Sequence, residues 1–151
     1  MDLPPPADPL LHYLTSALTK DGKRARASGI VSRMLLHVHA LSRGAPPLDI
    51  VREAVFAAAP SIRIKNNKRA ATVVPVPMVM NEKARVRGAV KWILQEVEVG
   101  RKGGRKGPMR VEERLAREVI KIVQGQSEVL KKKETLHKHA MVNRGNALSR
   151  V

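Results

Sequence analysis

Apolar residues along most of this chain recur every three or four positions, which is the period of an amphipathic helix. The pattern is clearest in residues 23–43, where Ala27, Val31, Met34 and Val38 fall on one stripe. Six segments share it: about 9–20, 23–43, 48–59, 82–97, 110–124, and 132 onward, the last fraying toward the end of the chain. Glycine and proline turn signals separate these segments, so the sequence predicts six helices.

Residues 61–80 follow a different pattern, with a period of two. Ile62–Lys65 alternates apolar and basic residues, a basic polar tip follows at Asn66–Arg69, and a second strand covers Thr72–Met80. Pro75 and Pro77 lack N–H donors on the same edge of that strand, which suits the outer edge of a free-standing ribbon. We therefore predict a mainly α fold: a six-helix bundle with one protruding two-stranded β-hairpin.

The length of 151 residues favours one domain, which we place at residues 8–151 behind a flexible proline-rich tail at 1–7. Aromatic residues make up only 2% of the chain, so the core must be aliphatic. The chain has no cysteine and no apolar run long enough to span a membrane. Its first residues do not resemble a signal or transit peptide.

Charge narrows the choice of partner. The chain has 29 Lys and Arg against 13 Asp and Glu, a net charge of +16. The excess is local, because residues 61–110 hold thirteen basic side chains and only three acidic ones. A surplus of this kind indicates nucleic acid. An anionic membrane is disfavoured, because the predicted helices carry few aromatic anchors.

The candidate nucleic-acid ligands gather at the first turn, the hairpin, the start of the fourth helix, a glycine-rich loop and the last helix. They are Lys20, Lys23, Arg24, Arg26, Arg63, Lys65, Lys68, Arg69, Lys83, Arg85, Arg87, Lys91, Arg101, Lys102, Arg105, Lys106, Lys131, Lys132, Lys133, His137 and Arg144. A solvated polar face explains such residues in most proteins. We favour phosphate binding for the hairpin and fourth helix, where no acid interrupts the series. At the first turn, plain surface charge is almost as good an explanation.

The sequence shows no catalytic or metal-binding set. His37 and His39, like His137 and His139, are two residues apart and so point to different faces of a helix. Gly100–Gly107 lacks the lysine-hydroxyl ending of an NTPase loop. We therefore interpret it as a flexible basic loop that becomes ordered on RNA. We therefore expect no enzyme, no cofactor and no metal. A DNA-architectural protein and a structure-specific nuclease are the rivals. The first needs an apolar wedge at the hairpin tip and the second needs a cluster of carboxylates, and the sequence shows neither feature.

Five segments in order resemble the bacterial-type small-subunit ribosomal protein seven family, over nearly the whole chain from Asp8. Asp21–Arg24 resembles its Asp-Gly-Lys-Lys turn, and Pro60–Met80 aligns with its hairpin without a gap. Lys91–Leu94 resembles its Arg-Trp-Ile-Val helix, and Glu113–Glu118 its Arg-Leu-Ala-Asn-Glu element. Lys131–Asn143 resembles its closing Lys-Lys-Arg-Glu…His…Ala…Asn pattern.

The resemblance implies a target in the 3′ major domain of small-subunit rRNA, in the subunit head, where the family protein acts early in assembly. It also implies a hairpin near messenger RNA and the tRNA exit site, with other head proteins as neighbours. The positions that inherit RNA-facing roles are Lys23, Arg24, Lys65, Lys68, Arg69, Arg85, Lys91, Lys131 and Lys132.

The chain departs from the family pattern in four places. Ala70–Ala71 replaces two glycines at the hairpin tip, and Ala84 replaces one of a pair of arginines. An acidic, proline-rich tail replaces a basic arm, and the loop around Gly103 is longer and more basic. These departures favour a mitochondrial member acting in the matrix, with a divergent protein of the bacterial cytoplasm as the alternative.

Overall fold

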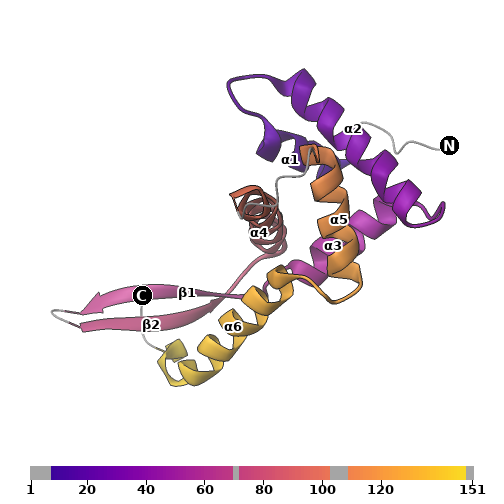
Figure 1. Ribbon diagram of the computed structural model, residues 1–151. Coiled ribbons are helices and arrows are strands. Elements are labelled where there is room, and N and C mark those ends of the chain that lie inside the picture. Colours follow the sequence, from indigo (N-terminus) through magenta and orange to yellow (C-terminus); the bar gives the residue numbers. More distant parts are fainter. Residues whose placement is uncertain (1–7, 70–71, 103–108, 149–151) are drawn as a thin grey trace.

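The structure is a computed structural model that describes residues 8–69, 72–102 and 109–148. In this part of the chain, six α-helices carry one antiparallel hairpin (Figure 1), which confirms the predicted fold class. The elements are α1 (Pro9–Leu18), α2 (Arg24–Leu41), α3 (Pro47–Ala58), β1 (Ile62–Arg69), β2 (Thr72–Val79), α4 (Glu82–Lys102), α5 (Val111–Val123), α6 (Glu128–Val142) and the short 3-10 helix η1 (Arg144–Leu148).

Helix α5 is the centre of the helical body. It packs against α2, α3 and α4, and its apolar stripe is buried from Leu115 to Ile122. The stripe of α4 meets it with Ala89, Val90 and Ile93, each at most 2% exposed. The core cluster of buried residues is aliphatic, as the composition predicts. Burial of these side chains is the main force that holds the helices together.

Asp8 fixes the start of α1. Its Oδ1 accepts hydrogen bonds from the N–H groups of Leu10 (2.9 Å) and Leu11 (3.2 Å), and its Oδ2 accepts one from Arg52 Nη2 at 2.6 Å. Burial alone would raise the pKa of Asp8. These bonds and the charge of Arg52 outweigh it and hold that pKa below its ordinary value. Asp8 therefore caps α1 and ties it to α3.

Replacing Asp8 by Asn tests this ion pair alone, because Asn also caps helices. At neutral pH we expect Asp8→Asn to lower the free energy of unfolding by about 1–2 kcal/mol. A lowered folded-state pKa means that the carboxylate stabilises the fold above its unfolded pKa, and that this contribution is lost as pH falls through the folded pKa. The gap between wild type and variant in urea unfolding should therefore close in acid. Asp49→Asn is the control, since Asp49 also meets Arg52 (3.6 Å) but is exposed.

The hairpin projects from the body beside α6 (Figure 1). The N–H of Met80 donates to the carbonyl of Ser61, and the register places Pro77 opposite Ile64 and Pro75 opposite Asn66. Because hydrogen-bonded and non-hydrogen-bonded pairs alternate, both prolines fall on the outer edge of β2, in agreement with the prediction.

The ribbon is nevertheless not free-standing. Helix α6 contacts β1, η1 contacts β2, and Asn146 Nδ2 donates to the carbonyl of Pro75 on that outer edge (3.1 Å). Val76 is consequently only 1% exposed. The sequence predicted a frayed end where η1 lies, because the pairing of Asn146 with a residue 71 positions away leaves no local signal.

Three predicted boundaries were wrong. β1 continues to Arg69 rather than ending at Lys65, because Asn66 and Asn67 pair across the hairpin with Pro75 and Val74. Helix α4 continues past Val97 to Lys102, since a single glycine at position 100 lowers helix stability without ending the helix. Helix α6 begins at Glu128 rather than Lys132, because the Ser127 hydroxyl caps it by accepting from the Val129 N–H.

Candidate nucleic-acid interface

The turn between α1 and α2 leaves the start of α2 open to an anion. Asp21 (φ 53°) and Gly22 (φ 71°) both adopt the left-handed conformation, which glycine allows freely and Asp tolerates. Helix α2 then begins without a side-chain cap and without an acid in its first turn. Lys23 and Arg26 are exposed there, so their charges oppose the helix dipole unless an anion binds.

The hairpin carries exposed cations on both faces. Arg63 and Lys65 lie on one face and Lys68 on the other, because strand side chains alternate. The backbone of Arg69 is part of β1, whereas its side chain lies outside the described residues.

Helix α4 separates its charges from its core face. Lys83, Arg87 and Lys91 recur every four residues and are all exposed. Arg85 differs, because it is partly buried and its Nε has no hydrogen-bond partner. Arg101 and Lys102 fall on the last turn of α4 with their side chains undescribed, and Arg105 and Lys106 lie outside the described residues.

The cations of α6 are bound within the protein. Lys131 pairs with Glu128 (2.5 Å) and Lys132 with Glu96 of α4 (2.6 Å). Lys133 Nζ donates to the carbonyl of Ala57 at the end of α3 (2.6 Å), and burial, followed by the charge of Arg85, lowers the pKa of Lys133. The contacts of Lys132 and Lys133 join α6 to α4 and α3 and give these two lysines structural roles. The pair of Lys131 is exposed and lies within α6, so it contributes little to stability.

Two other candidates also have partners inside the chain. His137 Nε2 accepts from the Ser61 N–H (3.3 Å), which joins α6 to the base of β1. Lys20 meets Glu98 at 3.4 Å, an exposed pair that contributes little to stability. His137 is thereby held against the fold, whereas Lys20 is restrained only weakly.

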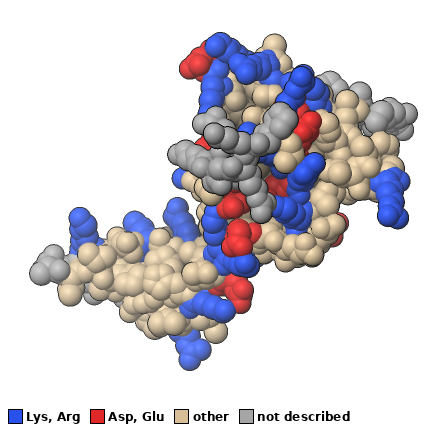
Figure 2. All heavy atoms as spheres, in the orientation of Figure 1, with Lys and Arg blue, Asp and Glu red and all other residues tan. Residues whose placement is uncertain are grey.

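Ten candidates remain exposed and without an acidic partner among the described residues, and we call them the exposed cations. They are Lys23, Arg24, Arg26, Arg63, Lys65, Lys68, Lys83, Arg87, Lys91 and Arg144. The ion pairs of the described chain use seven acidic residues: Asp8, Asp49, Glu96, Glu98, Glu112, Glu128 and Glu134. Figure 2 shows basic side chains along the hairpin and on the upper body. With so few acids left, these cations repel one another, and an external polyanion would relieve that repulsion.

The sequence analysis missed a basic stripe on α5. Arg114, Arg117 and Lys121 recur at helical spacing on one side of this helix, and Arg110 precedes them as its N-cap residue. All but Arg114 are exposed. Their helical spacing is visible in the sequence and is the same kind of signal that identified Lys83, Arg87 and Lys91.

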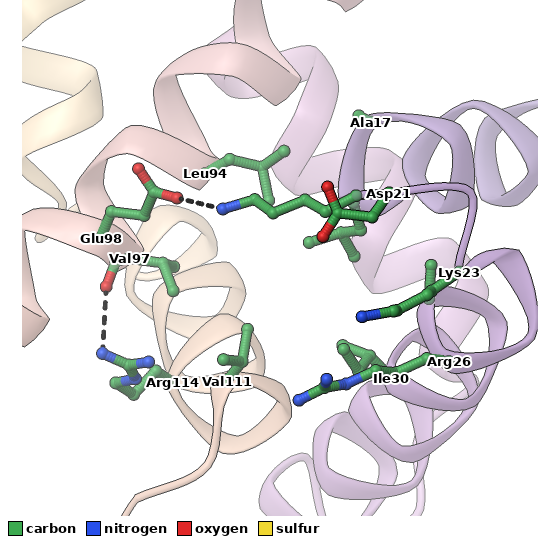
Figure 3. A pocket seen from close by; sticks show the side chains of 13 residues that line it. Ala17, Asp21, Lys23, Arg26, Ile30, Leu94, Val97, Glu98, Val111 and Arg114 are labelled. Carbon is green, nitrogen blue, oxygen red and sulfur yellow. Dashed lines mark hydrogen bonds and ion pairs between the residues drawn. The ribbon is translucent and has the colours of Figure 1, made fainter.

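A cavity of about 320 Å³ lies between the α1–α2 turn, the second half of α4 and the start of α5 (Figure 3). Its apolar lining consists of Ala17, Leu18, Ala27, Ile30, Leu94, Val97 and Val111. Its polar lining consists of Lys20, Asp21, Lys23, Arg26, Glu98 and Arg114. Three sequence-predicted cations, Lys20, Lys23 and Arg26, are thus brought together around one apolar hollow.

The described residues give no indication of a metal site or of a membrane-spanning helix. It contains no group of three or more His, Asp or Glu side chains placed to hold a metal ion. Nor does any helix in the described ranges combine the length and apolar character needed to cross a membrane.

Comparison with known proteins identifies the family. Residues 4–144 match the model of the family described as ribosomal protein S7p/S5e. Small ribosomal subunit protein uS7m of Schizosaccharomyces pombe is 32% identical over 151 residues, all of this chain and 56% of that protein. Small ribosomal subunit protein uS7 of Pseudothermotoga lettingae is 32% identical over 141 residues, covering 93% of this chain and 86% of the relative. The uS7c protein of Bigelowiella natans is 25% identical over 135 residues, 89% and 82% of the two chains.

The present chain therefore spans just over half the length of the S. pombe relative and most of the length of the other two. The family match covers nearly all of the helices and the whole hairpin. Together with the basic surface described above, it confirms the resemblance seen in the sequence: the chain belongs to the ribosomal protein S7p/S5e family.

Proposed function

We propose that this chain binds the 3′ major domain of small-subunit rRNA and helps to assemble the head of the mitochondrial small ribosomal subunit, in the matrix. Family membership makes the chain a structural constituent of the ribosome and not an enzyme. The uS7m relative, which is matched over all of this chain, favours mitochondria over a bacterial cytoplasm. A DNA-architectural role loses its support, because the family match is to ribosomal proteins.

One observation carries the proposal: the exposed cations extend from the α1–α2 turn over α4 to the hairpin, without acidic partners in the described chain. Contacts of this kind position a protein on the phosphates of folded RNA. The projecting hairpin is the element that we place near messenger RNA and the exit-site tRNA, whereas the body faces rRNA and neighbouring head proteins.

A paired set of variants tests the hairpin's part in this function. Lys65→Ala with Lys68→Ala removes two unpaired cations, and we expect weaker binding to a transcript of the 3′ major domain without loss of fold, since both side chains are exposed. Each lost phosphate contact should also reduce the salt slope of binding by about one. Filter binding and circular dichroism measure the two effects.

Lys131→Ala with Lys138→Ala is the matched control. It removes the same charge, but Glu128 and Glu134 already neutralise these lysines. Equal losses in the two double variants would show that affinity follows net charge and not the hairpin. Wild-type binding to a 5′-domain transcript as tight as to the 3′ major domain would contradict the proposed target.

A further inference from the structure

We propose that the cavity between the α1–α2 turn, α4 and α5 holds one unstacked nucleotide of the bound RNA, with its base on the apolar floor and its phosphate at the basic rim. This inference rests on the proposed function, because it names what the protein recognises at one place in its RNA target. It goes further by assigning a pocket, and not only a charged surface, to that recognition.

The floor supplies the place for the base. Ile30 of α2, Leu94 of α4 and Val111 of α5 are all only partly buried and all line the hollow. Apolar groups that converge on a concave site lower the free energy when a flat, weakly solvated group covers them. A phosphate or an acidic side chain alone would leave this floor uncovered. An unstacked RNA base has two such faces, and proteins read RNA chiefly through bases of this kind.

The rim supplies the place for the phosphate. Figure 3 shows Lys23 and Arg26 directed from the α2 side into the hollow, toward Val111 and Arg114 on the opposite wall. Neither Lys23 nor Arg26 has an acidic partner in the described chain. Arg114 donates through Nη1 to the carbonyl of Val97 at 3.4 Å, and its buried Nε has no hydrogen-bond partner.

The acids of the rim do not cancel this charge. Glu98 is paired with Lys20 at 3.4 Å, which leaves Asp21 against three cations. The first turn of α2 adds backbone N–H groups and the positive end of its dipole on the same side. The rim therefore attracts an anion, and the floor selects one that carries a flat ring.

The size of the cavity also favours a single nucleotide. At about 320 Å³ it lies at the lower end of small-ligand pockets. It is too small for a helical segment of RNA, whose phosphates need only a convex basic surface.

Filling the hollow without changing charge tests the proposal. Ala17 lines the cavity and is exposed on α1, so Ala17→Trp should occupy the floor. We expect the affinity for the 3′ major domain transcript to fall about 10-fold or more, because a base contact is lost. The salt slope should not change, because no phosphate contact is lost. Ala40→Trp is the matched control, since Ala40 is exposed on α2 and does not line the cavity. Circular dichroism checks that both variants fold.

A measurement on the wild-type chain makes the test independent of the variant. Methyl NMR of Ile30, Leu94 and Val111 should show larger shifts with uridine 5′-monophosphate than with ribose 5-phosphate, which has the same charge but no base. Equal shifts would reduce the cavity to an anion site and overturn the inference. Larger shifts with a poly-glutamate peptide would overturn it in favour of an acidic protein partner.

The two levels of the proposal fail in different ways. If wild type binds the transcript and Ala17→Trp binds it equally well, the cavity is not a nucleotide site, whereas the proposed function holds. If wild type shows no preference for the transcript, the proposed function fails first.

Discussion

Raising monovalent salt from about 50 to about 200 mM should weaken binding to small-subunit rRNA about a thousandfold or more. The reason is the release of counterions from phosphates that the protein neutralises. Ten exposed cations without acidic partners can make six to ten such contacts, which is the range that produces a loss of this size. A plot of log affinity against log salt, from filter binding at several concentrations, gives the number of contacts as its slope.

Two controls make the slope interpretable. Circular dichroism at each salt concentration must show an unchanged fold, since screening also weakens exposed ion pairs such as Lys20–Glu98. The Lys65/Lys68 double variant should lower the slope by about two, whereas the Lys131/Lys138 variant should leave it unchanged. A nearly flat slope for wild type would contradict an interface built on the exposed cations.

The sequence predicted the elements whose signals are local. The 3.6-residue period of Val86, Val90, Ile93 and Val97 identified the core face of α4, on which Val86 is partly buried and the other three are buried. Pro75 and Pro77 identified an outer strand edge by the donors they lack. In both cases, the physical constraint acts on neighbouring residues and is therefore visible in the sequence.

The features that escaped prediction depend on partners far away in the chain. Lys132 meets Glu96 and Lys133 meets the carbonyl of Ala57, so two cations that suggested a phosphate site brace α6 against α4 and α3. Nothing near Lys132 or Lys133 in the sequence reveals those contacts. The extension of β1 to Arg69 likewise follows from cross-strand pairing, which overrode the polar composition of Asn66 and Asn67.

The candidate site shows the same division. Its cations were predicted from composition and helical phase, and the ion pairs formed in the fold separate the paired ones from the unpaired ones. The cavity could not be predicted, because its walls come from residues 17–30, 94–98 and 111–114, which only the packing of α1, α2, α4 and α5 brings together.

Two substitutions two residues apart on α4 should separate stability from RNA binding. Ile93 is 2% exposed within the core, so Ile93→Ala should lower the free energy of unfolding by about 2–5 kcal/mol through lost burial and the cavity it leaves. Lys91 is exposed and has no acidic partner in the described chain. Lys91→Ala should therefore barely change the urea midpoint, while it weakens rRNA binding by the loss of one phosphate contact.

Urea unfolding and filter binding of both variants decide whether α4 has been assigned the correct faces. The assignment rests on phase: Ile93 shares its stripe with Ala89, Val90 and Val97, whereas Lys91 continues the series of Lys83 and Arg87. The RNA affinity of Ile93→Ala is measured without urea, at a temperature at which the variant is fully folded. The measurement then reports binding and not unfolding. If Lys91→Ala is the variant that destabilises the fold, the basic side of α4 is packed against the protein and its role in tracking phosphates is wrong.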